Sequence, residues 1–129
     1  MLTESIIVSD ITKSFSKTKV LKGVNLKIEK GSQYVIKGSS GSGKSTLLYL
    51  LGGLDRPDSG VISVNGENLS GFSDDQLARY RNEKIGFVFQ FHFLLSSMSC
   101  LDNILLPASL SKNASINEVR SFVDEVAKL

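Results

Sequence analysis

One glycine-rich segment holds the residues best suited to chemistry, and that chemistry is phosphate binding. Residues 38–45 read Gly-Ser-Ser-Gly-Ser-Gly-Lys-Ser and match the pattern G-x-x-x-x-G-K-[ST] at every required position. The glycines allow positive φ angles and let the backbone approach a phosphate without an intervening Cβ. Successive N–H groups from about Ser40 to Thr46 would then point inward and bind an anion at the start of a helix.

The polar residues of this segment have predicted roles. We expect Lys44 to place its charge near the β- and γ-phosphates, Ser45 to ligate Mg²⁺ and Thr46 to reach the α-phosphate. The alternative is a chance glycine- and serine-rich linker, but the apolar run before the segment and the leucines after it argue against that. The pattern predicts a nucleoside-triphosphate site and leaves its use open. The predicted ligand-binding residues here are Gly38, Ser39, Ser40, Gly41, Ser42, Gly43, Lys44, Ser45 and Thr46.

The elements that must position this loop are predicted from hydrophobic periodicity. The apolar run at 6–8 and the alternating residues over 24–28 indicate strands, and the run Tyr34–Ile36 indicates a strand leading into the loop. Leucines at helical spacing over 47–51 indicate a helix, which the glycine pair at 52–53 ends. A strand before the loop and a helix after it are the context that the phosphate-binding pattern requires.

Strand and helix signals continue beyond the loop. Residues 61–66 indicate a strand followed by an Asn-Gly hairpin turn, and a capping box beginning at Ser73 indicates a helix to about residue 81. Residues 85–89 indicate another strand. A second capping box at Ser115 opens a helix with an apolar stripe. These elements predict an α/β fold.

Length and composition exclude several classes of protein. The 129 residues fit one domain, with 41% hydrophobic residues, 22% charged residues and a net charge of +2. That charge gives no sign of a nucleic-acid partner, and we expect none. The single cysteine, Cys100, excludes an intrachain disulfide and a four-cysteine zinc site. The first residues lack the features of a signal peptide, and no apolar run reaches the roughly 18 residues of a membrane span.

Over its whole length the sequence resembles the ATP-binding subunits of ATP-binding-cassette (ABC) transporters. The resemblance is carried by residues 11–15 and 20–31, by the phosphate-binding loop, by 52–60 and 64–66, and by 85–90, which resemble the segment called the Q-loop. It implies that Phe15 stacks on adenine and that Gln90 approaches Mg²⁺ and the attacking water. Lys44 and Gln90 are thus the candidate catalytic residues, and Ser45 and Gln90 the candidate metal ligands. The plainer alternative for Phe15 is an ordinary strand aromatic.

The resemblance also implies a fold and a set of partners. We expect a P-loop NTPase fold: an antiparallel β subdomain, the P-loop strand and helix, the start of a helical subdomain, and an incomplete sheet. Residues 1–129 would be a partial nucleotide-binding domain, truncated within the helical subdomain after the Q-loop. The implied partners are integral membrane transporter subunits and a second ATPase subunit, at the cytoplasmic face of a bacterial inner membrane.

The subfamily that the sequence resembles most is the ATPase of the bacterial lipoprotein-releasing system. Residues 50–55, 89–95 and 101–107 support this, although the macrolide-export and cell-division ATPases share much of the pattern. The resemblance implies that His92 belongs to a surface that receives a membrane subunit. A lone histidine in an ordinary packing role is the alternative.

Four parts of an ABC ATPase are absent from the sequence: the Leu-Ser-Gly-Gly-Gln signature, the apolar strand ending in Asp-Glu, the D-loop and the switch histidine. Residues 69–72 begin like the signature and 122–125 end like the Asp-Glu strand, but we interpret both as structural, the second as part of a helix. We therefore expect the 129 residues alone to lack steady ATPase activity. The alternative function is a non-hydrolysing P-loop nucleotide-binding module, or a non-functional truncated fragment.

Overall fold

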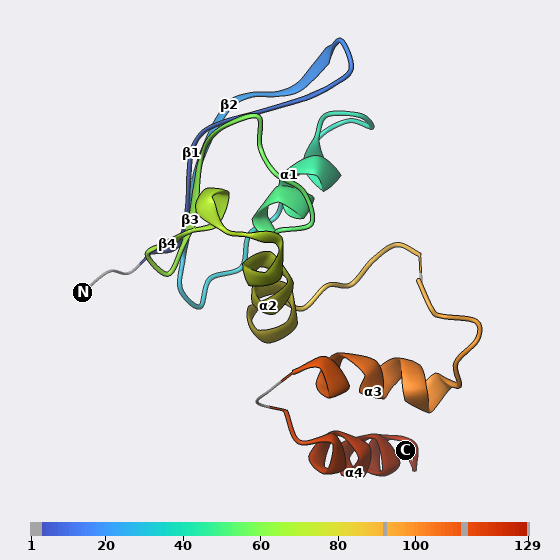
Figure 1. The fold of residues 1–129 in the computed structure, drawn as a ribbon. Coiled ribbons are helices and arrows are strands. Elements are labelled where there is room, and N and C mark those ends of the chain that lie inside the picture. The colour runs from blue at the N-terminus through green and yellow to red at the C-terminus, as the bar shows by residue number, and fades with distance from the viewer. Residues whose placement is uncertain (1–3, 92, 112–113, 129) are drawn as a thin grey trace. The chain divides into compact units, whose positions relative to one another are not determined.

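The computed structural model describes residues 4–91, 93–111 and 114–128, which fall into two compact units. The first unit, Met1–Arg81, contains a sheet with helices, and the second, Asn82–Leu129, contains two helices joined to an extended segment (Figure 1). His92 lies outside the described residues, and its predicted role stays a prediction.

The first unit is built on an antiparallel sheet with strand order β2-β1-β3-β4. The strands are β1 (Glu4–Phe15), β2 (Thr18–Glu29), β3 (Ser59–Val64) and β4 (Glu67–Asn68). The predicted strands at 6–8, 24–28 and 61–64 are confirmed, since they lie within β1, β2 and β3. The Asn65-Gly66 turn is also confirmed, because both residues adopt the positive φ angles, 50° and 86°, of a tight hairpin turn.

The β1–β2 hairpin places Phe15 at its tip. Phe15 pairs with Thr18, and the two residues between them form the turn, with Ser16 at a φ of 53°. The ring of Phe15 is half exposed, so the predicted aromatic platform is open to a ligand rather than sealed in the core.

Helix α1 (Lys44–Leu51) buries three leucines, Leu47, Leu50 and Leu51, against the rest of the unit. It ends at the predicted glycine pair, where Gly53 has a φ of 68°. The buried apolar residues of this unit are Val8, Ile11, Leu21, Leu47, Leu50, Leu51, Ile62, Leu69, Leu77 and Tyr80. Leu69 belongs to the short helix η1 (Leu69–Gly71), and its burial agrees with the structural interpretation of the first signature-like stretch.

Helix α2 (Asp74–Lys84) begins at the predicted capping box. The Gln76 N–H donates to Ser73 Oγ at 3.3 Å, and the Ser73 N–H donates to Gln76 Oε1 at 2.8 Å. The helix ends three residues later than predicted. Its Tyr80 hydroxyl donates a buried hydrogen bond to the Leu51 carbonyl at 3.0 Å, which ties α2 to the end of α1.

Two predicted strands, Tyr34–Ile36 and Ile85–Phe89, are wrong. Neither segment lies in a strand among the described residues, and Val35 is 78% exposed. An apolar run becomes a strand only when neighbouring strands take up its backbone hydrogen bonds. The described strands pair with one another in the antiparallel sheet, so these two segments have apolar strand composition without a ladder.

The second unit contains α3 (Cys100–Leu110) and α4 (Ile116–Val126). The sequence pattern did not predict α3. Pro107 interrupts its pattern, but the box formed by Ser99 and Asp102, with the Asp102 N–H donating to Ser99 Oγ at 3.1 Å, was a usable signal. Helix α4 is confirmed, as is the helical interpretation of residues 122–125. No helix in the described part of the chain is long and apolar enough to cross a membrane.

We predict that Tyr80→Phe destabilises the protein by about 1 kcal/mol at pH 7, because the Leu51 carbonyl loses its donor. Burial raises the pKa of Tyr80 to about 12. The raised pKa stabilises the folded state fully below the unfolded-state pKa of about 10, and this contribution is lost as the pH rises toward 12. Urea unfolding from pH 7 to 11 measures both effects.

The matched control is Tyr49→Phe, since Tyr49 is exposed in α1. Equal stability losses for the two variants, or an unchanged alkaline slope in Tyr80→Phe, would contradict the prediction.

Candidate nucleotide-binding site

The glycine-rich loop packs directly against β2. Gly41 and Gly43 have φ angles of 76° and 91°, in the region that favours glycine. A Cβ built on Gly43 would lie 2.8 Å from Leu21 Cδ2 and 3.0 Å from Val20 Cγ1. Only glycine therefore fits at this position, both for its backbone conformation and for the space beside it.

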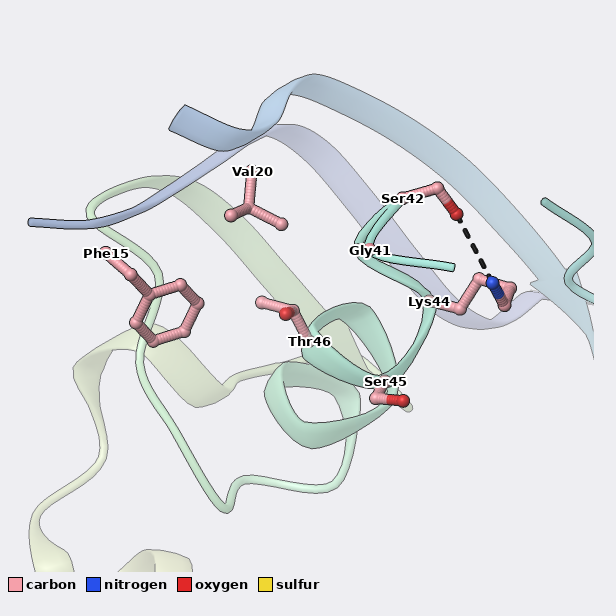
Figure 2. A pocket seen from close by; sticks show the side chains of 8 residues that line it. Phe15, Val20, Gly41, Ser42, Lys44, Ser45 and Thr46 are labelled. Carbon is pink, nitrogen blue, oxygen red and sulfur yellow. Dashed lines mark hydrogen bonds between the residues drawn. The ribbon is translucent and has the colours of Figure 1, made fainter. Parts of the chain in front are cut away.

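Lys44 is the first residue of α1, and its ammonium is held by oxygens of the loop itself. Lys44 Nζ donates to the Gly38 carbonyl at 2.8 Å and to the Ser39 carbonyl at 2.6 Å. It also donates to Ser42 Oγ at 3.4 Å (Figure 2). These acceptors are neutral, so they orient the charge without cancelling it. The loop thus presents a positioned cation beside a helix start.

The start of α1 is suited to an anion. Its N-cap is Gly43, and no side chain caps the first turn. The first N–H groups of a helix have no partner within the helix, and the helix dipole adds partial positive charge there. Ser45 and Thr46 place hydroxyl groups on the same turn. Together with Lys44, these donors fit the chemistry of a triphosphate.

A cavity of about 260 Å³ joins the loop to the hairpin tip. Its lining consists of Phe15, Val20 and residues 41–46. Figure 2 shows Phe15 and Lys44 on opposite sides of Thr46. The cavity therefore has an apolar, aromatic end and a cationic end, as a nucleotide requires. The sequence analysis did not single out Val20; the signal was its place five residues after Phe15, where the hairpin returns.

Gln90 lies in the second unit, at an exposed bend directly after residues 85–89. Its predicted approach to Mg²⁺ and the attacking water stays a prediction. Among the described residues, no group of three or more His, Cys, Asp or Glu side chains could hold a metal ion. A hard cation here would depend on hydroxyl, amide and phosphate oxygens, and Mg²⁺ is commonly held through substrate phosphates.

A comparison with protein families identifies the chain. The sequence matches the ABC transporter family over residues 21–128, which is most of its length. This chain belongs to the ABC transporter family.

Lipoprotein-releasing ATP-binding proteins are among the curated relatives of this ABC transporter chain. The LolD protein of Cytophaga hutchinsonii is 43% identical over 111 residues, which cover 86% of the chain and 51% of the relative. The LolD protein of Buchnera aphidicola is 47% identical over 123 residues, covering 92% of the chain and 53% of the relative. The chain thus spans about half the length of the curated relatives it matches.

Solved ABC cassettes share the fold. The dimeric ATP-binding cassette MJ0796, in a post-hydrolysis state bound to ADP and Pi, superposes with a TM-score of 0.85 at 36% identity. The match covers 95% of this chain and 56% of the cassette. A second dimeric MJ0796 structure gives a TM-score of 0.84. These neighbours confirm the predicted fold class, an incomplete ABC ATPase fold with an antiparallel sheet and helices.

We predict that Gly43→Ala destabilises this ABC transporter chain by about 2–5 kcal/mol, since a left-handed backbone and a crowded Cβ both oppose alanine. Gly66→Ala is the matched control, because Gly66 has a similar φ of 86° with open space around its Cβ position. The control loses only the conformational part, about 1–2 kcal/mol. Urea unfolding of the two variants tests this, and equal losses would show that contact with β2 contributes nothing.

Proposed function

We propose that the chain binds ATP together with Mg²⁺ and forms the nucleotide-binding part of an ABC transporter ATPase. One observation carries the proposal: Phe15, Lys44 and the first turn of α1 line the same cavity. That arrangement offers an aromatic face for a base and donors for phosphates within a single site. The similarity to a cassette bound to ADP and Pi supports the same ligand class.

Different residues of the site contact the base and the phosphates of the ligand. The Phe15 ring stacks on adenine, and an aromatic face suits a flat heterocycle. Backbone N–H groups from Ser40 to Thr46 surround the phosphates, and Lys44 exchanges its neutral loop acceptors for phosphate oxygens. The Thr46 hydroxyl reaches the α-phosphate.

Ser45 and Gln90 are the residues of this chain that would hold Mg²⁺. The Ser45 hydroxyl stands on the first turn of α1, and both side chains offer the oxygen ligands that the ion prefers. When bound, the ion would neutralise negative charge that develops on the phosphates during transfer. Gln90 also orients the attacking water in this proposal.

In the full-length protein we propose that two such subunits pair and couple ATP hydrolysis to transport through integral membrane subunits. The ATPase would sit peripherally on the cytoplasmic face of the inner membrane. The similarity to lipoprotein-releasing ATP-binding proteins favours lipoproteins as the transported substrate.

A second candidate function is nucleotide binding without turnover. It applies to the 129 residues by themselves, which contain neither a Leu-Ser-Gly-Gly-Gln signature nor an apolar strand ending in Asp-Glu. The two candidates share the same site and differ in whether hydrolysis follows binding.

We predict that Lys44→Ala weakens Mg-ATP binding about ten- to one hundred-fold, because one charge-assisted hydrogen bond to phosphate is lost. Isothermal titration calorimetry on the purified chain measures the affinity. Lys30→Ala, which removes an exposed lysine after β2, is the control for net charge and leaves the affinity within two-fold. Equal Mg-ATP affinities for Lys44→Ala and the wild type would contradict the proposed function.

We also predict that the 129-residue chain by itself releases no phosphate from ATP in steady state, since it lacks the signature and the catalytic glutamate. A phosphate-release assay compares the chain with its Lys44→Ala variant. Release above that variant would overturn this prediction and favour the hydrolytic candidate for the chain alone.

A further inference from the structure

Lys13 occupies an unusual position beside the aromatic end of the site. Its side chain is only 12% exposed, although lysine is seldom buried without a partner. Lys13 Nζ lies 2.8 Å from Asp55 Oδ1 and donates to the Arg56 carbonyl at 2.6 Å. The same ammonium lies over the Phe15 ring, 5.4 Å from its centroid. One partly buried cation therefore contacts both the ring and the loop that follows α1.

We propose that Lys13 is a positioning residue for the nucleotide base: anchored by Asp55, it holds the Phe15 ring in place for stacking. This inference rests on the proposed function, because it takes Phe15 as the adenine platform. An ammonium over an aromatic face is attracted by the ring's quadrupole within about 6 Å. The ring has two faces, so a cation over one leaves the other for a base.

Helix α1 connects the Lys13–Asp55 pair, which anchors the ring, to the phosphate end of the site. Asp55 stands four residues after α1, and α1 begins at Lys44. Lys13 therefore links the ring, through Asp55 and the helix, to the loop that is to hold the phosphates. A rigid helix between the two ends fixes their separation, which is what a site needs to recognise base and phosphates together.

Other bonds fasten the same loop to the end of β1. The Ser14 N–H donates to Asp58 Oδ2 at 2.7 Å, and the Asp58 N–H donates to the Thr12 carbonyl at 2.9 Å. Thr12 Oγ1 and Ser59 Oγ are 2.7 Å apart. These contacts hold the backbone of β1 against the loop, so removing Lys13 would release the ring without detaching the strand.

The charge state of Asp55 supports the anchor. Burial by itself raises the pKa of Asp55, but the hydrogen bonds from Lys13 and the Arg56 N–H, with the Lys13 charge, bring it below its usual value. Asp55 is therefore ionised at neutral pH and pairs with a cation. The pair lies at the aromatic end of the site, so we expect its loss to weaken binding of the base rather than binding of the phosphates.

The test compares ATP with inorganic tripolyphosphate, which carries phosphates without a base. We expect Lys13→Met to weaken Mg-ATP binding about three- to ten-fold and to leave tripolyphosphate binding within two-fold. Asp55→Asn should also weaken Mg-ATP binding. Lys13→Arg should retain the ATP affinity that Lys13→Met loses, because arginine keeps a cation over the ring. Lys30→Met controls for the lost charge.

A double-variant cycle separates positioning from a general structural role. If Lys13 acts through the ring, Lys13→Met has no further effect on ATP affinity in a Phe15→Leu background. Additive losses, an unchanged ATP affinity, or equal losses for ATP and tripolyphosphate would each overturn the proposal. If Lys44→Ala instead leaves the affinities for both ATP and tripolyphosphate unchanged, the proposed function itself is wrong.

A second measurement needs no nucleotide. The sequence contains no tryptophan, so Phe15→Trp places a unique fluorophore at the hairpin tip. We expect Lys13→Met in that background to lower the fluorescence anisotropy and raise acrylamide quenching, whereas Lys30→Met changes neither. Identical signals with and without Lys13 would show that the lysine does not hold the ring.

Discussion

The contact between the Gly43 backbone and the side chains of Val20 and Leu21 is the constraint on which the candidate site depends. The loop lies directly on β2, and a Cβ at position 43 would therefore have no room. Helix α1 starts at this contact, and its buried leucines fix its direction. Because the same hairpin carries Phe15 at its tip, one contact relates the cationic end of the cavity to its aromatic end.

Helix α1 is fastened to the hairpin at both of its ends. At the start, Gly43 lies against β2; beyond the end, Asp55 receives Lys13 from β1. Close packing resists compression, while the ion pair and its hydrogen bonds resist separation, so the two ties act in complementary ways. A helix held at both ends keeps its first turn at a constant distance from the Phe15 ring, as recognition of a ligand with two chemically different ends requires.

The two segments that the sequence analysis assigned wrongly show a different physical situation. Tyr34–Ile36 contributes, with Leu26 and Leu48, to a largely apolar cavity of about 510 Å³ beside α1. The segment is as apolar as a buried strand, yet Val35 is exposed and no ladder forms along it. Composition records what a segment can bury, whereas hydrogen-bonded neighbours decide whether it becomes a strand.

The phosphate loop, the α1 helix with its glycine stop, and the Asn65-Gly66 hairpin could all be predicted from the sequence. In each case residue type acts on the φ angles or caps of its immediate neighbours. The sequence could not predict that Val20 lines the cavity, that 34–36 and 85–89 form no strands, or that Lys13 contacts Asp55. These depend on where the chain returns after many residues, and local preferences carry no information over such separations.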